Sequence, residues 1–152
     1  MMCLLTLFTS SADATTKEVS IKVNIFKDSN SAELSIETDS DVYTAIYNVK
    51  KKSFLDLDIG FTLSSPTSNS ENYKIELMSS EHQCDSTSVD IKILFDGAEL
   101  VDNSTDFMEF QYTNDDVRTS QHRFTLIYPE LLQIDSMQTC SGILHVYASL
   151  DI

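Results

Sequence analysis

Residues 16–26 read Thr-Lys-Glu-Val-Ser-Ile-Lys-Val-Asn-Ile-Phe and carry the clearest structural signal in the chain. The apolar members of this stretch alternate with polar ones and are Val19, Ile21, Val23 and Ile25. A period of two residues is typical of a β-strand with one buried face. The polar residues 27–31 that follow contain neither Asn-Gly nor Asp-Gly, so we expect no tight hairpin. The strand must therefore pair with a distant segment, either in its own chain or in another molecule.

Alternating segments continue along the rest of the chain. Residues 53–63 predict a single strand, and residues 141–152 predict another that alternates to the last residue. Residues 89–95 predict a strand that ends at Asp96-Gly97, a strong signal for a two-residue hairpin turn. The polar residues 81–87 predict a loop. Because no long stretch has a helical period, the sequence predicts an all-β sandwich.

Composition limits the classes of function. A chain of 152 residues suits one domain, and a hydrophobic content of 41% is too high for a disordered tail. Three glycines and two prolines exclude collagen-like and linker-like classes. The net charge of −14 argues against nucleic acid and against an anionic membrane surface, since both would repel the chain.

Residues 1–14 have the features of a secretory leader. A short apolar run from Leu4 to Phe8 is followed by Ala12-Asp13-Ala14, which matches a signal-peptidase site with cleavage after Ala14. The basic start of such a leader is missing, and we interpret the segment as a truncated leader rather than a short buried strand. The mature chain is then expected to be secreted.

Removal of the leader would take away Cys3 and leave two cysteines, Cys84 and Cys140. In an oxidising compartment, an even pair predicts a disulfide. Metal binding is the alternative, because His82 lies two residues before Cys84, but a single such pair is weak evidence for zinc.

Three segments resemble one known family, the chaperone–usher pilins of the colonisation-factor-antigen type (class 5 fimbriae). Residues 16–23 are similar to the N-terminal donor strand of that family. Residues 89–100, Val-Asp-Ile-Lys-Ile-Leu-Phe-Asp-Gly-Ala-Glu-Leu, resemble its hairpin, with 107–110 in the acidic-aromatic segment that follows. Residues 140–150, Cys-Ser-Gly-Ile-Leu-His-Val-Tyr-Ala-Ser-Leu, resemble its closing strand.

The resemblance implies an immunoglobulin-like β-sandwich that lacks one strand and is completed by donor-strand exchange. Residues 15–27 would be the donor strand and 28–152 the pilin domain. The side chains entering the groove of a neighbouring subunit would be those of Val19, Ile21, Val23 and Ile25. The residues lining the groove and facing the chaperone would be Leu144, Val146, Ala148, Leu150 and Ile152. The implied partners are other fimbrial subunits, a periplasmic chaperone, an outer-membrane usher and a host-cell receptor, on a fimbria exported through the periplasm.

Catalytic and metal-binding residues are not predicted. Asp56 and Asp58 are interpreted as a solvated strand face, and the three histidines, with His145 on an exposed face, are scattered. The acidic pairs Asp39/Asp41 and Asp115/Asp116 lack the spacing of an EF-hand calcium site. An enzyme and a cofactor are therefore not expected.

A second class of function stays open, a self-contained secreted sandwich that binds its ligand as a monomer. Asn103-Ser104-Thr105 is a glycosylation acceptor pattern and would suit such a domain. A monomeric binder would pair residues 19–25 inside its own sheet, whereas a pilin would donate them.

Overall fold

The computed structural model describes residues 20–29, 33–132 and 138–151. Within these ranges all the secondary-structure elements are β-strands, so the predicted all-β class is confirmed. The predicted leader (1–14), Val19 and Ile152 lie outside the described residues. The strands are β1 (Ser20–Ser29), β2 (Ser35–Thr38), β3 (Val42–Asn48), β4 (Ser53–Phe54), β5 (Leu57–Pro66), β6 (Asn72–Cys84), β7 (Thr87–Ser88), β8 (Lys92–Phe95), β9 (Ala98–Glu99), β10 (Met108–Glu109), β11 (Tyr112–Thr113), β12 (Val117–Ile127) and β13 (Cys140–Leu150).

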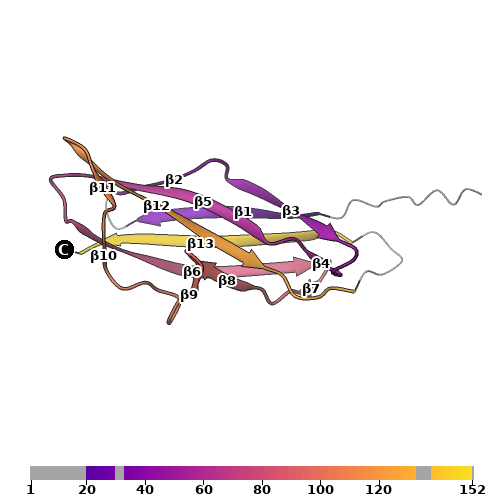
Figure 1. Ribbon diagram of the computed structural model, residues 1–152. Coiled ribbons are helices and arrows are strands. Elements are labelled where there is room, and N and C mark those ends of the chain that lie inside the picture. The colour runs from indigo at the N-terminus through magenta and orange to yellow at the C-terminus, as the bar shows by residue number, and fades with distance from the viewer. Residues whose placement is uncertain (1–19, 30–32, 133–137, 152) are drawn as a thin grey trace, which may run out of the picture.

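The first sheet contains both ends of the described chain. Its order is β10-β6-β13-β1-β3-β4, with β7 paired to β6. Figure 1 shows β1, in indigo, running beside the yellow β13, and the two strands are parallel. The other pairs in this sheet are antiparallel. The N-terminal strand thus lies inside the sheet rather than at its edge.

The second sheet has the order β2-β5-β12-β8-β9, with β11 paired to β12, and its pairs are all antiparallel. The turn between β8 and β9 is Asp96-Gly97, with φ angles of 47° and 86°. A two-residue hairpin turn of type I′ needs positive φ at both positions, which Asp and Gly adopt more readily than most residues. The predicted hairpin is confirmed.

The core lies between the two sheets and is built by alternation along the long strands. Along most of β5, β12 and β13, buried residues alternate with more exposed ones. The fully buried apolar side chains include Ile59, Leu63, Ile75, Phe124, Leu126, Leu144 and Ala148. Burial of such side chains contributes roughly 25 cal/mol per Å² of apolar surface. The described chain is therefore a β-sandwich closed around one core.

The loop predicted over residues 81–87 is wrong, because β6 continues to Cys84. The cause is a β-bulge: Leu77 pairs with Val146 and Ser79 with His145, so Met78 has no partner on β13. Before the bulge the buried residues of β6 are odd-numbered, and after it they are His82 and Cys84. An extra residue reverses which parity faces the core, and that reversal hid the second half of β6 in the sequence.

Two smaller predictions also need correction. Residues 53–63 do not form one strand, because the chain breaks at residues 55–56 between β4 and β5. Leu55 is consequently 40% exposed instead of facing the core. His145 is half-buried rather than exposed.

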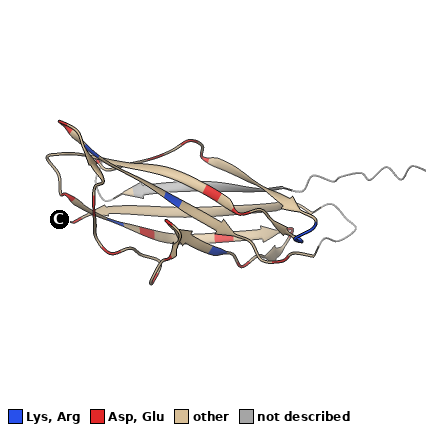
Figure 2. Cartoon of the chain, viewed as in Figure 1, with Lys and Arg blue, Asp and Glu red and all other residues tan. Residues whose placement is uncertain are grey.

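Acidic side chains predominate on the described surface. In Figure 2, Lys and Arg are scattered along the strands, and they gather only at the turn between β3 and β4. That turn is residues 50–52, three consecutive lysines, and the Asn48 side chain accepts hydrogen bonds from the backbone N–H groups of Lys50 and Lys51. In the part of the chain that the structure describes, no helix has the length and apolarity required to span a membrane.

Candidate functional site

The position of β1 between β13 and β3 is the candidate functional site, and we call it the strand seat. Residues Ile21 to Ser29 pair in parallel with Cys140 to Ala148. On the other side, residues Ser20 to Asn24 pair in antiparallel with Ile46 to Val42. Of the predicted donor residues, Ile21, Val23 and Ile25 stand opposite Cys140, Gly142 and Leu144 of β13.

The wall that β13 presents to the core is apolar. Leu144, Val146, Ala148 and Leu150, predicted to line a groove, are all buried. On the β3 side the wall continues through Ala45, which is buried, and Tyr43, which is half-buried. The structure thus brings the predicted groove residues and the predicted donor strand together in one chain.

One residue pair along the strand seat, Val23 with Gly142, differs from the others because Gly142 has no side chain. The imidazole of His82, on the neighbouring β6, occupies the space above Gly142: a Cβ on residue 142 would lie only 2.6 Å from His82 Cε1. The His82 ring is held by a 3.0 Å hydrogen bond between Nε2 and Ser80 Oγ and by an edge-on contact with Tyr128. Its Nδ1 atom has no hydrogen-bond partner among the described residues.

His82 is only 4% exposed, and burial lowers its pKa from 6.5 to about 4. Desolvation penalises the charged imidazolium, and no carboxylate among the causes of the shift compensates for it. His82 is therefore neutral at physiological pH and packs as a ring in the wall of the seat. The metal site considered from the His82–Cys84 spacing is not supported, because Cys84 is bonded to Cys140.

The disulfide between Cys84 and Cys140 confirms the predicted pairing. The two cysteines are directly opposite each other on β6 and β13. Cys140 is also the β13 partner of Ile21, so the disulfide anchors β13 to β6 at the first residue pair of the strand seat. Both cysteines are buried, which keeps the bond away from solvent reductants.

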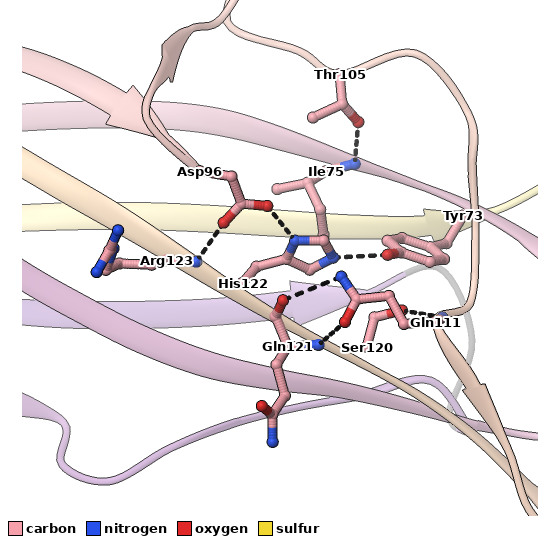
Figure 3. Close-up of polar contacts among 9 residues, drawn as sticks. All are labelled: Tyr73, Ile75, Asp96, Thr105, Gln111, Ser120, Gln121, His122 and Arg123. Atoms are coloured by element: carbon pink, nitrogen blue, oxygen red, sulfur yellow. Dashed lines mark hydrogen bonds and ion pairs between the residues drawn. The ribbon is translucent and has the colours of Figure 1, made fainter.

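A second polar cluster joins the two sheets away from the seat (Figure 3). His122 on β12 contacts the Asp96 carboxylate through Nδ1 and the Tyr73 hydroxyl through Nε2, each at 2.6 Å. Burial raises the pKa of Tyr73, so its hydroxyl keeps its proton and donates to Nε2. The Nδ1–H group then donates to Asp96, whose other carboxylate oxygen accepts from the Arg123 backbone N–H at 2.9 Å.

The order Asp-His-Tyr resembles a catalytic relay, but its surroundings favour a structural role. Tyr73 is 0% exposed, and its ring packs against Phe110 at a centroid distance of 4.5 Å. The His122 ring contacts the aromatic rings of Phe61 and Phe95, at centroid distances of 5.6 and 4.9 Å. A hydroxyl without solvent access cannot attack a substrate, so the cluster acts as a clamp that ties β6 to β12 and to the β8–β9 turn.

The buried positions of His82 and His122 were not predicted from the sequence, which considered His82 only as a metal ligand beside Cys84. His122 has the same parity as the apolar residues Phe124 and Leu126, which was a usable signal that it faces the core. His82 gave no such signal, because the bulge at Met78 reverses the parity of β6.

The outer edge of β6 is protected by its own chain. The Ile75 N–H donates to Thr105 Oγ1 at 3.0 Å, and the Thr105 N–H donates to the Ile75 carbonyl at 2.9 Å. The Leu77 N–H donates to the Asn103 carbonyl at 2.8 Å. These bonds cover a strand edge that would otherwise invite pairing with other chains. Asn103, the predicted glycosylation acceptor, is exposed and lies in the loop that covers this strand edge.

No protein-family model and no curated protein matches this sequence.

Proposed function

We propose that the chain is a structural subunit of a bacterial surface fimbria that polymerises by donating its N-terminal strand to the strand seat of a neighbouring subunit. The observation that carries this proposal is the place of β1: this first strand of the described chain lies between β13 and β3, which pair with no other described strand on those sides. Its departure would split the first sheet into β10-β6-β13 and β3-β4.

An empty seat would be costly. It would leave unpaired backbone groups along β13 and β3 and expose the apolar row of Leu144, Val146 and Ala148. Open edges of this kind are aggregation hazards. A strand from another molecule can satisfy the same groups, because strand addition takes its affinity from main-chain hydrogen bonds and its specificity from alternate side chains.

The direction of β1 supports exchange. β1 runs parallel to β13 along its longer contact and antiparallel to β3 along its shorter one. Parallel pairs are slightly less stable per residue than antiparallel pairs. A donated strand that entered in the opposite direction would be antiparallel to β13 over the longer contact, so intermolecular pairing would be favoured once the seat is vacated.

A fimbrial subunit of this kind would need other proteins for its assembly. A periplasmic chaperone would cover the seat before assembly, an outer-membrane usher would bring subunits together, and the fibre would support adhesion to host cells. The wall residues Leu144, Val146, Ala148 and Leu150 would be the chaperone's contact.

One observation favours the alternative, a self-contained secreted sandwich that binds as a monomer. In a single chain, β1 already fills the seat and completes the sheet. The two functions differ in whether that pairing persists when many copies are present.

The test is the size distribution of the purified mature chain, as wild type and as Val23→Asp. Val23 belongs to the apolar row of the alternating stretch, and an unpaired charge in that row costs several kcal/mol when the strand enters an apolar groove. We expect wild type to form concentration-dependent fibres or oligomers and Val23→Asp to form none. Asn24→Asp is the matched control, because it adds the same charge at the neighbouring position of the alternation and is expected to assemble normally.

Two results would reject the proposal. Wild type that stays monomeric at every concentration would favour the self-contained binder. Normal fibres from Val23→Asp would mean that polymerisation does not use this strand.

A further inference from the structure

The two ends of the sandwich differ in charge. One end carries the lysine turn, residues 50–52, and lies opposite the C-terminus in Figure 2. The Leu131 N–H donates to the Lys52 carbonyl at 2.6 Å, which places the turn beside the segment that leads from β12 to β13. Lys52 pairs with Glu130 at 3.7 Å, whereas the other two lysines are exposed and form no ion pair with any described residue. We name this the basic end.

The opposite end is acidic and lies where β13 finishes. Its exposed carboxylates are those of Glu71, Asp115, Asp116 and Asp151. The β5–β6 loop is at this end because β6 begins opposite the last residues of β13, and the Thr67 N–H joins it to the β11–β12 turn by donating to the Asp116 carbonyl at 3.0 Å. Glu71 is paired with Arg118 at 3.1 Å, but Asp115 and Asp116 form no ion pair with any described residue. We name this the acidic end, and the 11 residues of β13 separate it from the basic end by about 35 Å.

A donated strand would bring the acidic end of its own copy with it. In the described chain β1 finishes at Ser29, and Ser29 Oγ donates to the Leu34 carbonyl at 3.0 Å. Leu34 lies at the acidic end, because β2 starts opposite the end of β5. Residues 30–32 connect β1 to Glu33, and the four Cα–Cα steps from Ser29 span at most about 14 Å. The acidic end of the donor therefore has to begin close to the point where its strand finishes in the acceptor.

The direction of the donated strand decides which end of the acceptor it meets. A strand that entered in the direction of β1 would finish beside Ala148, so the acidic ends of two copies would face each other. Two copies in that arrangement would exchange strands reciprocally and close into a dimer. A strand that entered antiparallel to β13 would finish near Cys140, so the acidic end of the donor would face the basic end of the acceptor. That contact is head-to-tail and continues as an open fibre.

We propose that the lysine turn is the docking surface for the acidic end of the next copy, and that this charge complementarity directs strand donation into an open fibre rather than a closed, strand-swapped dimer. The inference rests on the proposed function, because it needs a strand that passes between copies. Complementary charges steer the encounter of two surfaces, while like charges that face each other suppress it. The net charge of −14 makes copies repel each other in most orientations, which leaves the basic end as the favoured contact.

Zero-length coupling tests the contact in the wild-type chain. A carbodiimide joins a lysine amine to a carboxylate as an amide, with overall loss of water, only where the two groups are in contact. The lysine turn and the Asp115–Asp116 pair lie at opposite ends of one chain, so an amide between them has to connect two copies. We expect mass spectrometry to find this amide in assembled protein and not in monomer. Assembled protein without it would overturn the proposal.

Charge reversal tests the effect on assembly. Lys50→Glu with Lys51→Glu makes both ends acidic, and we expect fibre growth at low salt to slow about tenfold as steering is lost. Asp115→Lys with Asp116→Lys makes both ends basic and should slow growth similarly. All four substitutions together exchange the charges of the ends and should restore growth. In about 1 M salt, where charges are screened beyond about 3 Å, the variants should differ little.

A matched control separates the basic end from net charge. Lys92→Glu with Arg123→Glu changes the net charge by the same amount, but these residues lie on β8 and β12, between the two ends. Its fibres should grow within about twofold of the wild-type rate, as expected for charges outside the contact. Equal slowing by the control and by the Lys50 and Lys51 variant, or no recovery in the fourfold variant, would overturn the proposal.

The wild-type chain separates a failure of this inference from a failure of the proposed function. Wild type that stays monomeric would reject both. Fibres whose growth does not respond to charge reversal would overturn the inference and leave strand donation standing. Strand-swapped dimers in place of fibres would show that strands pass between copies but that the charged ends do not direct them, which also overturns the inference.

Discussion

Tyr73 on β6 and His122 on β12 are joined by a 2.6 Å hydrogen bond between the phenolic oxygen and Nε2, and this bond links the two sheets of the sandwich. Both residues are buried, so neither atom can turn to water if its partner is lost. The bond also orients His122, because it leaves Nδ1–H to donate to Asp96, a residue of the β8–β9 turn. The turn is thereby held to the core by the linked side chains of Tyr73, His122 and Asp96.

The first prediction is that Tyr73→Phe destabilises the fold. The substitution keeps the ring and its packing against Phe110 but leaves His122 Nε2 without its donor. An unsatisfied buried polar group costs about 1–3 kcal/mol. Chemical denaturation should show a loss of this size with an unchanged m-value.

Tyr112→Phe serves as the control for Tyr73→Phe, because the Tyr112 side chain is 63% exposed. Its free energy of unfolding should stay within about 0.5 kcal/mol of wild type, as is usual for surface substitutions. Equal stability of the Tyr73 and Tyr112 variants would mean that the clamp contributes nothing.

The second prediction concerns the disulfide. Cys84 and Cys140 are separated by 56 positions. Closing a loop of this length removes entropy from the unfolded chain worth about 4 kcal/mol at 25 °C. Replacing both cysteines by alanine should lower the free energy of unfolding by about that amount. Mass spectrometry of the chain purified from an oxidising compartment should find neither thiol free, and two free thiols would contradict the assignment.

Alternation in the sequence predicted the strands whose pattern is unbroken. It located β13 and the Asp96-Gly97 hairpin, because a period of two residues and a type I′ turn are local properties. It failed where the chain departs from regularity. The bulge at Met78 and the break after Phe54 each change which residues face the core, and neither is marked by Gly or Pro.

The partners of each strand could not be predicted, since alternation gives a face and not a neighbour. The sequence therefore left open whether residues 19–25 pair within the chain, and the parallel contact of β1 with β13 comes from the three-dimensional arrangement alone. The cysteine count sufficed for the disulfide, because two cysteines allow only one pairing. The position of His82 over Gly142 was out of reach, because it depends on the register of β6 against β13.

The third prediction is that His82 makes the fold sensitive to mild acid. Its pKa is about 4 in the folded chain and 6.5 when unfolded. Between these values the unfolded chain binds a proton that the folded chain does not, so stability falls as pH falls from about 6.5 towards 4. The full difference is about 3 kcal/mol. Above pH 7 this contribution should be constant.

The His82→Phe variant isolates the contribution of His82, because it keeps a flat ring near Gly142 but cannot be protonated. Unfolding free energies of both chains should be measured at intervals from pH 7.5 to pH 4. Other groups titrate in both chains, so only the difference between the two curves reports His82. The free energy of unfolding of wild type minus that of His82→Phe should decrease as the pH falls. Parallel curves would show that His82 does not titrate on unfolding.

The last prediction is that a strand attached at the other end of the chain can fill the seat. A copy of residues 17–26 is fused after Ile152 through a short flexible linker, and the original N-terminal segment is deleted. The copy would start beside the end of β13 and fold back antiparallel to it. A short linker gives an effective concentration on the order of millimolar, and the buried surface contributes roughly 25 cal/mol per Å². We expect a soluble monomer with a much higher melting temperature than the deleted chain without the copy. A fused copy with aspartate in place of Val23 should not rescue it, because the charge would stand in the apolar row of the alternating strand, which has to enter the apolar seat. If the deleted chain is as stable and monomeric as the fused one, then the sandwich does not need a strand in the seat, and a fibre built by strand donation has no driving force.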